Sequence, residues 1–464
     1  MRTYYYSFLL LCVFILPAAA QTIQPFKQRD RVVFTGNSIT DGGHYHSYIW
    51  LYYITHFPKR RITVFNAGIG GDVSRQMLER FDRDVFAKKP SVVTLTFGMN
   101  DTGYQNPKGN KADSTYAAKI AGSLKSFRLI EDKLKQHPEI RKIMIASPPY
   151  DETAKFNNTP LIGKNTAMLK IADDQQSTAI KNHWDFIDLN RSMTAINLNQ
   201  QKTDSAFTME GGDRIHPTND GQMVMAYLFL KAQGLAGKKV ANIVINADVK
   251  KVTLTENCAI TALQINNEHI KFNYLANSLP YPLDTVPSGF GRPGKSQAQA
   301  LKLIPFTEEF NQEIVQVKGL KPTALYTLKM DNQLIETWSG DDYAKGINMA
   351  LLNNTPQYQQ ATALMHINEE RWTIERRLRE YYWMHYSILK PKGMLFNDSP
   401  ATLDSLQKYA KKDFFVAVTL PTYQKARIKS VRDTWQKEID MLTNELYRIN
   451  KPVNHVIEIA LAKK

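Results

Sequence analysis

Cysteine is nearly absent from this chain. Only two cysteines occur in 464 residues, and one of them, Cys12, lies in an apolar stretch at the N-terminus. If that stretch is removed, Cys258 is left alone and no intramolecular disulfide can form. The fold must then be stabilised by its hydrophobic core, for which the chain is long enough.

Long apolar runs and nucleic-acid motifs are also missing. After residue 20, no segment stays free of charges over the roughly 20 residues that a membrane-spanning helix needs. Zinc-finger, RNP and helix-turn-helix patterns do not occur, so we expect neither an integral membrane segment nor a nucleic-acid partner. The composition, 43% hydrophobic and 22% charged, is that of a globular protein, and the length predicts two or three domains.

The N-terminus has the pattern of a secretory signal. Residues 1–20 place Arg2 before the apolar run Phe8–Leu16, and the small residues Ala18, Ala19 and Ala20 follow. The apolar run is too short to cross a bilayer, so it predicts a signal peptide that is cleaved. We therefore expect an exported protein, periplasmic or secreted.

Positive charge is in excess. Lys and Arg number 59 against 44 Asp and Glu, which gives a formal charge of +15. Such an excess favours anionic partners such as an acidic polysaccharide, and a generally basic surface is the simpler interpretation. If the charge gathers at a substrate cleft, acidic polysaccharides should bind more weakly as salt is added.

The chain divides into regions that differ in composition and in the periodicity of their apolar residues. Residues 30–235 alternate short apolar β-type runs with helix-type segments, which predicts an α/β fold with a parallel sheet covered on both faces. Segments with strand-type patterns and a Pro/Gly-rich loop follow. After them, apolar residues recur at spacings of three, four and seven, which is typical of helices. We predict a signal peptide at 1–20, an α/β domain at 21–237, a β-rich module at 238–340 and a helical C-terminal region at 341–464.

The predicted strands of the α/β domain end in polar loops. The strands are expected at Arg31–Thr35, Ile62–Asn66, Ser91–Phe97, Lys142–Ala146 and Trp184–Asp188. The loops after the first three read GNSIT, NAGIGGDVS and FGMNDTG, and a fourth loop, GGDRIHPTNDG, precedes a helix-type segment. Open α/β sheets bind ligands at the carboxyl ends of their strands, so these loops are the candidate site.

The loops together contain the parts that acyl transfer needs. Ser38 is the candidate nucleophile, His216 the general base, and Asp213, three residues before it, the group that orients the imidazole. The backbone N–H groups of Ser38 and Gly71 and the side chain of Asn100 are the candidate oxyanion-hole donors.

These four blocks resemble the GDSL/SGNH hydrolases, which carry Ser, Gly, Asn and His in this order. The family's usual Asn-Ala-x-Ile-x-Gly-Asp run matches residues 66–72, which favours Gly71 over Gly70. The family's Asp-x-x-His block falls on Asp213 and His216. One departure is that the signature Gly-Asp-Ser is Gly36-Asn37-Ser38 here, which changes the charge beside the nucleophile.

The resemblance implies a flavodoxin-like three-layer α/β hydrolase that works without a metal or cofactor. It further implies a secreted serine esterase, with removal of O-acetyl groups from a polysaccharide as the leading interpretation. A lipase, lysophospholipase or thioesterase is the first alternative, although no long apolar lid segment is evident. The second is a non-catalytic glycan-binding protein on this scaffold.

Aromatic and histidine side chains near the loops allow two further interpretations. Four tyrosines are either sugar-stacking residues or ordinary packing residues: Tyr45, Tyr48, Tyr104 and Tyr150. His44 and His46 have the spacing of half a metal site, but no cluster of carboxylates or cysteines completes it, so we predict no metal site.

Overall fold

The structure is a computed structural model that describes residues 22–105, 112–156, 158–266, 269–287 and 294–462. The predicted signal peptide lies outside the described residues. Within them, no helix is both long and apolar enough to cross a membrane.

The α/β domain is built on a five-stranded parallel sheet in the order β2-β1-β3-β4-β5. Its strands are β1 Arg31–Gly36, β2 Thr63–Gly68, β3 Val92–Phe97, β4 Arg141–Ala146 and β5 Asp185–Asp188. This order is the flavodoxin-like one, so the predicted fold class is confirmed. The observed strand bounds lie within two residues of the predicted ones.

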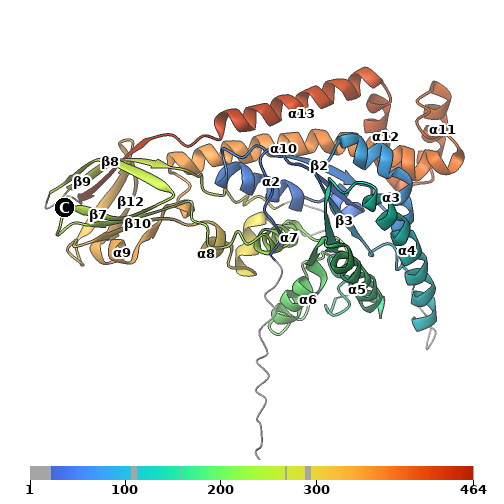
Figure 1. Cartoon of the computed structure of the whole chain (residues 1–464), viewed down its shortest axis with the longest axis horizontal. Helices are drawn as coiled ribbons and strands as arrows, with labels where there is room; N and C mark the ends of the chain where they lie inside the picture. The colour runs from blue at the N-terminus through green and yellow to red at the C-terminus, as the bar shows by residue number, and fades with distance from the viewer. Residues whose placement is uncertain (1–21, 106–111, 157, 267–268, 288–293, 463–464) are drawn as a thin grey trace, which may run out of the picture.

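Helices cover both faces of this sheet and make a three-layer sandwich (Figure 1). One face packs against α2 Tyr45–His56, α6 Leu189–Gln200 and α7 Asn219–Ala232; the other packs against α3 Ser74–Arg80, α4 Ala112–Lys135 and α5 Lys164–Asn182. The strands are buried on both sides: in β1, Val32 and Phe34 belong to one apolar cluster and Val33 to the other. The short helix α1, Ser38–Asp41, directly follows β1.

The β-rich module is a sandwich of two sheets around one apolar core. The sheet orders are β13-β10-β6-β7 and β12-β11-β14-β9-β8. The strands are β6 Ala241–Asn246, β7 Lys251–Glu256, β8 Cys258–Ile265, β9 His269–Ala276, β10 Glu313–Lys318, β11 Leu325–Met330, β12 Gln333–Ser339, β13 Ile347–Asn348 and β14 His455–Leu461. The short helix α9 Gly340–Lys345 contacts this module, whereas α8 Phe306–Phe310 packs against α2 and α7 of the α/β domain.

The C-terminal region is mostly helical, but its last strand returns to the β module. Its helices are α10 Pro356–Trp383, α11 Pro400–Ala410, α12 Phe414–Ala426 and α13 Lys429–Ile449. The end of the chain, HVIEIAL, alternates apolar and polar residues, and β14 inserts between β11 and β9 with Ile457 and Ile459 buried. The interval 341–464 therefore also supplies strands to the sandwich.

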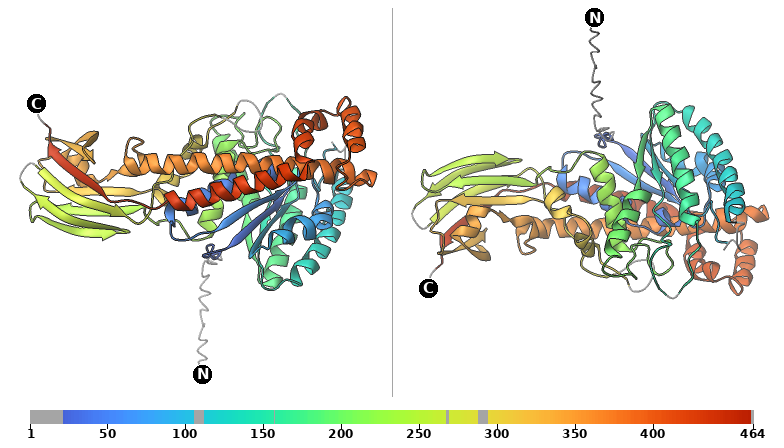
Figure 2. Two further views of the ribbon diagram at one scale, coloured as in Figure 1. Left: turned by 90° about the horizontal axis from the view of Figure 1, so that it is seen from above. Right: turned by 90° about the horizontal axis from the view of Figure 1, so that it is seen from below.

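The two long helices α10 and α13 lie side by side and run from the β module along the α/β domain (Figures 1 and 2). They are docked onto the α/β domain by specific contacts: the Tyr447 hydroxyl accepts a hydrogen bond from Trp50 Nε1 at 3.0 Å, and Asn450 Nδ2 donates to the Ile54 carbonyl at 3.0 Å. The helical region is thus packed on the α/β domain.

Candidate active site

Ser38 lies where β1 ends and α1 begins. Asn37 is the N-cap of α1, and its side-chain oxygen accepts a hydrogen bond from the Ile39 N–H at 3.0 Å. Gly36 is required at the tight turn, because a Cβ there would lie 2.2 Å from Thr40 Oγ1. The turn therefore holds the Ser38 hydroxyl at the carboxyl edge of the sheet.

His216 and Asp213 meet Ser38 in a continuous hydrogen-bonded chain. His216 Nε2 lies 2.8 Å from Ser38 Oγ, and His216 Nδ1 lies 2.6 Å from Asp213 Oδ2. Asp213 Oδ1 accepts from the backbone N–H groups of Ile215 and His216. Burial would raise the pKa of Asp213, but the His216 hydrogen bond and these N–H groups outweigh it and lower the pKa, so the carboxylate stays ionised.

Arg214, between these two residues, anchors the loop and was not predicted from the sequence. Its φ of 64° lies in the left-handed region, and its buried guanidinium donates to the carbonyls of Asp151, Ala154 and Asn158. The only signal in the sequence was its position inside the Asp-x-x-His block.

The candidate oxyanion donors lie on neighbouring loops. Gly71 has φ of 84°, a conformation that favours glycine, in the loop after β2. Asn100 follows β3, and its Nδ2 donates to the Asp72 carbonyl at 2.9 Å while its Oδ1 accepts from the Tyr104 hydroxyl at 2.5 Å. Since an amide nitrogen has two hydrogens, this arrangement leaves one to donate to an oxyanion.

The cleft over Ser38 has a volume of about 750 Å³, and helices α10 and α12 form part of its wall. Besides Ser38, His216 and the loops around them, it is lined by Trp372 and Trp383 of α10 and by Phe414, Phe415 and Val418 of α12. Phe414 and Phe415 are 74% and 61% exposed. The apolar spacing at 341–464 predicts helices but does not single out these side chains, so this apolar wall was not predicted from the sequence.

The charge of the cleft is opposite to that of the whole chain. Three carboxylates line it, those of Asp41, Glu369 and Glu380, against the single guanidinium of Arg376. Arg376 forms ion pairs with Asp41 and Glu380. The idea of a basic cleft for acidic polymers is therefore wrong, and the +15 of the chain is carried elsewhere.

Three of the four tyrosines predicted as substrate contacts are packing residues. Tyr45, Tyr48 and Tyr150 are only 1%, 5% and 4% exposed, because α2 is buried all around and Tyr150 packs into the same core. Tyr104 alone is exposed, beside Asn100, and stays a candidate contact.

The histidine pair near Ser38 does not form a metal site in the described structure. His46 is buried, and burial lowers its pKa to about 3. His44 stacks on Trp372 with ring centroids 3.9 Å apart and lies 3.3 Å from Glu369. Among the described residues, no group of three or more His, Cys, Asp or Glu side chains is close enough to hold a metal ion.

The fold and the hydrogen-bonded Ser-His-Asp arrangement are those of a serine hydrolase. A family model described as GDSL-like Lipase/Acylhydrolase family matches residues 34–224, and one described as Diltiazem deacetylase C-terminal helical domain matches residues 362–451. A solved structure of a gut microbial diltiazem-metabolizing enzyme is 47% identical, with a TM-score of 0.92, over 96% of this chain and 100% of that one. The chain belongs to the GDSL-like lipase/acylhydrolase family and is a carboxylic ester hydrolase.

A second relative resembles only part of the chain. The acetylxylan esterase of Geobacillus stearothermophilus is 25% identical in a 226-residue alignment that covers 44% of this chain and 94% of the esterase. That alignment has about the length of the α/β domain alone. The likeness to the diltiazem-metabolizing enzyme, in contrast, includes the helical region that forms the cleft wall.

Proposed function

We propose that this protein is a serine acetylesterase in which Ser38, His216 and Asp213 act as the catalytic triad. The observation that carries this proposal is the chain of hydrogen bonds from Asp213 through His216 to Ser38, which opens into the cleft. The other known parts of such a site, the oxyanion donors of Gly71 and Asn100, come from the loops after the two neighbouring strands.

The mechanism follows from these positions. Ser38 Oγ attacks the ester carbonyl carbon while His216 Nε2 takes its proton, and Asp213 holds the imidazole in the required tautomer. The carbonyl oxygen becomes an oxyanion that receives hydrogen bonds from the Ser38 and Gly71 N–H groups and from Asn100. His216 then gives the proton to the departing alcohol, and a water activated by His216 releases acetate from Ser38 in the second half of the reaction.

The apolar wall favours an alcohol that carries a flat ring. Two tryptophans and the two exposed phenylalanines of this wall offer stacking surfaces in the cleft. The relative that spans the whole chain is a diltiazem-metabolizing enzyme, so an acetate ester of a bulky ring-bearing alcohol is the first candidate substrate. An O-acetylated polysaccharide is the second, supported by the acetylxylan esterase relative.

Acetate release from a panel of esters tests the proposal. The panel contains diltiazem, acetylated xylan, acetylated pectin and nitrophenyl esters from acetyl to octanoyl, with Ser38→Ala as the control. We expect faster turnover of acetyl than of octanoyl esters, and of diltiazem than of the polysaccharides. Better turnover of octanoyl esters would support a lipase instead, for which Phe414 and Phe415 would offer the apolar surface that the sequence did not show.

We also propose that the chain is exported and cleaved after Ala20, on the signal pattern of its N-terminus. N-terminal sequencing of the mature protein from periplasmic and culture-supernatant fractions tests this. An intact Met1 in the cytosolic fraction would contradict it.

A further inference from the structure

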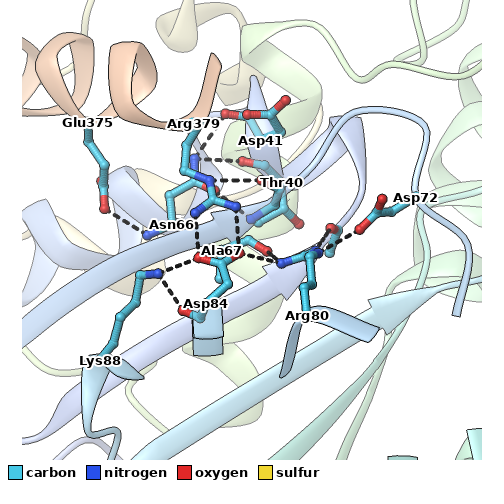
Figure 3. A network of polar contacts seen from close by, with 12 residues as sticks. Thr40, Asp41, Asn66, Ala67, Asp72, Arg80, Asp84, Lys88, Glu375 and Arg379 are labelled. Atoms are coloured by element: carbon cyan, nitrogen blue, oxygen red, sulfur yellow. Dashed lines mark hydrogen bonds and ion pairs between the residues drawn. The ribbon is translucent and has the colours of Figure 1, made fainter. Parts of the chain in front are cut away.

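The strand that leads into the oxyanion loop lies at the edge of the sheet, and helix α10 covers it (Figure 3). Strand β2 ends at Gly68, and the loop up to Asp72 carries Gly71. Glu375 Oε1 accepts a hydrogen bond from the Asn66 N–H at 2.9 Å, and Arg379 Nε donates to the Gly68 carbonyl at 2.9 Å. Helix α10 thus bonds the backbone of β2 on both sides of Ala67, at the end of the strand from which the loop starts.

Arg379 also belongs to a buried ion-pair network beneath this loop. Its two terminal nitrogens each lie 2.7 Å from a carboxylate oxygen of Asp84, in the π-helical turn Phe81–Val85. Asp84 in turn accepts from Arg80 Nη1 at 2.6 Å, and Lys88 pairs with the same carboxylate. Arg379 is 2% exposed and Arg80 and Asp84 are each 1% exposed, so water screens these charges little.

Arg80 extends this network to groups that lie close in sequence to Ser38 and Gly71. It donates to the Ala67 carbonyl at 2.8 Å, to the Gly36 carbonyl at 3.1 Å and to Asp72 Oδ2 at 2.7 Å. Gly36 lies two residues before Ser38, and Asp72 follows Gly71. The Asp72 carbonyl is also the partner of Asn100 Nδ2.

Asp84 is well supplied with positive charge, so the loss of one cation leaves it paired. Burial would raise its pKa, but Arg379 and Lys88 outweigh this and hold the pKa well below its usual range. Without Arg379, the carboxylate keeps Arg80 and Lys88. The Gly68 carbonyl, however, loses the donor that α10 gives it.

We propose that Arg379 is a positioning residue for the esterase reaction: it fixes the loop from Gly68 to Asp72 so that the Gly71 N–H points to the oxyanion. The inference rests on the Ser38 mechanism proposed above. Arg379 does not line the substrate cleft, so its action is through the loop and not through substrate contact. Through this one side chain, helix α10 supports the oxyanion loop of the α/β domain.

Arg379→Lys tests this inference in the full-length enzyme. Lysine keeps the charge beside Asp84 but cannot reach a carboxylate in bidentate fashion and the Gly68 carbonyl at once. We expect kcat for nitrophenyl acetate to fall roughly ten- to hundredfold, because small misplacements of catalytic groups cost that much, while KM changes less than about twofold. Hydrogen exchange of the amides in residues 68–72 should become faster.

Arg432→Lys is the matched control. Arg432 of α13 bonds Asp398 and the Ala426 carbonyl within the helical region and lies over the Tyr381 ring, so its loss affects the packing of that region without touching the loop. We expect its kcat and its exchange in residues 68–72 to match those of the wild type. If Arg379→Lys does not fold, Arg379→Gln replaces it with the same expected results.

Two outcomes would overturn the inference: an unchanged kcat in the Arg379 variant, or equal losses in the Arg379 and Arg432 variants. Failure of the proposed function gives a different result. In that case either the wild type fails to hydrolyse nitrophenyl acetate, or the Ser38→Ala variant retains the wild-type activity. The hydrogen-exchange comparison would still report whether Arg379 holds the loop.

Discussion

At the scale of single residues, Asn37 shows how the departure from the family signature is accommodated. The family's Asp at this position is replaced by Asn, whose side-chain oxygen still accepts the Ile39 N–H and caps α1. Asp and Asn are about equally good N-caps, so the turn that holds Ser38 does not depend on the charge. The substitution therefore changes the electrostatics beside the nucleophile and leaves its geometry intact.

Substitutions in the triad and the oxyanion hole should separate their contributions. Ser38→Ala and His216→Ala should each lower kcat for nitrophenyl acetate by several orders of magnitude, because each removes a group on which the others depend. Asn100→Ala should lower kcat roughly 10²–10³-fold, the usual effect of one oxyanion donor. Steady-state kinetics with circular dichroism as a folding control measures this, and retained activity in Ser38→Ala would refute the nucleophile assignment.

Glu210, three residues before Asp213, should make stability depend on pH. Burial raises its pKa from 4.5 to about 8, so the folded state retains a proton that the unfolded state releases. The contribution of Glu210 to the free energy of unfolding is therefore complete below pH 4.5 and is lost as pH rises to about 8. The side chain of Glu210→Gln stays neutral at every pH, so the variant lacks this pH dependence of stability.

Urea unfolding at several pH values between these limits measures the effect. We expect the free energy of unfolding of Glu210→Gln, relative to the wild type, to increase with pH across this window. The exposed Glu308→Gln is the control for the loss of a carboxylate. A difference between Glu210→Gln and wild type that is constant with pH would contradict the prediction.

At the scale of elements, α12 contributes a surface that no strand or loop of the α/β domain supplies. Phe415 lines the cleft but is mostly exposed, so truncating it costs little stability. Phe415→Ala should raise KM for a ring-bearing acetate such as diltiazem roughly two- to tenfold, the equivalent of one aromatic contact. For vinyl acetate, which has no ring, Phe415→Ala should have the same KM and kcat as the wild type.

Met441→Ala provides the matched control, since this side chain of α13 is 69% exposed and lies outside the cleft. It should change neither KM. Equal values of KM for diltiazem in the wild type and in Phe415→Ala would show that α12 does not contact the alcohol part of the substrate.

At the scale of the whole molecule, net charge and local charge have opposite signs. The chain is +15, whereas three carboxylates and one guanidinium line the cleft. Repulsion between the cleft and an acidic polymer is screened over about 8 Å at physiological ionic strength. KM for acetylated pectin should therefore fall or stay constant as salt is added, measured beside neutral acetylated xylan. A KM for pectin that rises with salt would indicate that the basic surface governs binding.

The α/β domain and its candidate reactive groups could be predicted from local patterns in the sequence. Val32, Val33 and Phe34 form a strand buried on both faces, and the glycine and polar residues after it end the strand in a turn at its carboxyl end. Asp213 and His216 are three residues apart in one loop, so their contact is local. Such features depend on residues close in the chain, and four of them in order were sufficient to indicate the site.

The distant segments that complete that site become apparent only in the folded chain. The bond between Asn66 and Glu375 and the contact between Trp50 and Tyr447 join residues more than 300 positions apart, and no local pattern encodes such pairs. The apolar spacing at 341–464 predicts helices, but it does not indicate that the sheet edge, and with it the oxyanion loop, would be the partner of α10. Periodicity shows that a face will be buried or bound, while the energy of packing it depends on surfaces brought together only when the whole chain folds.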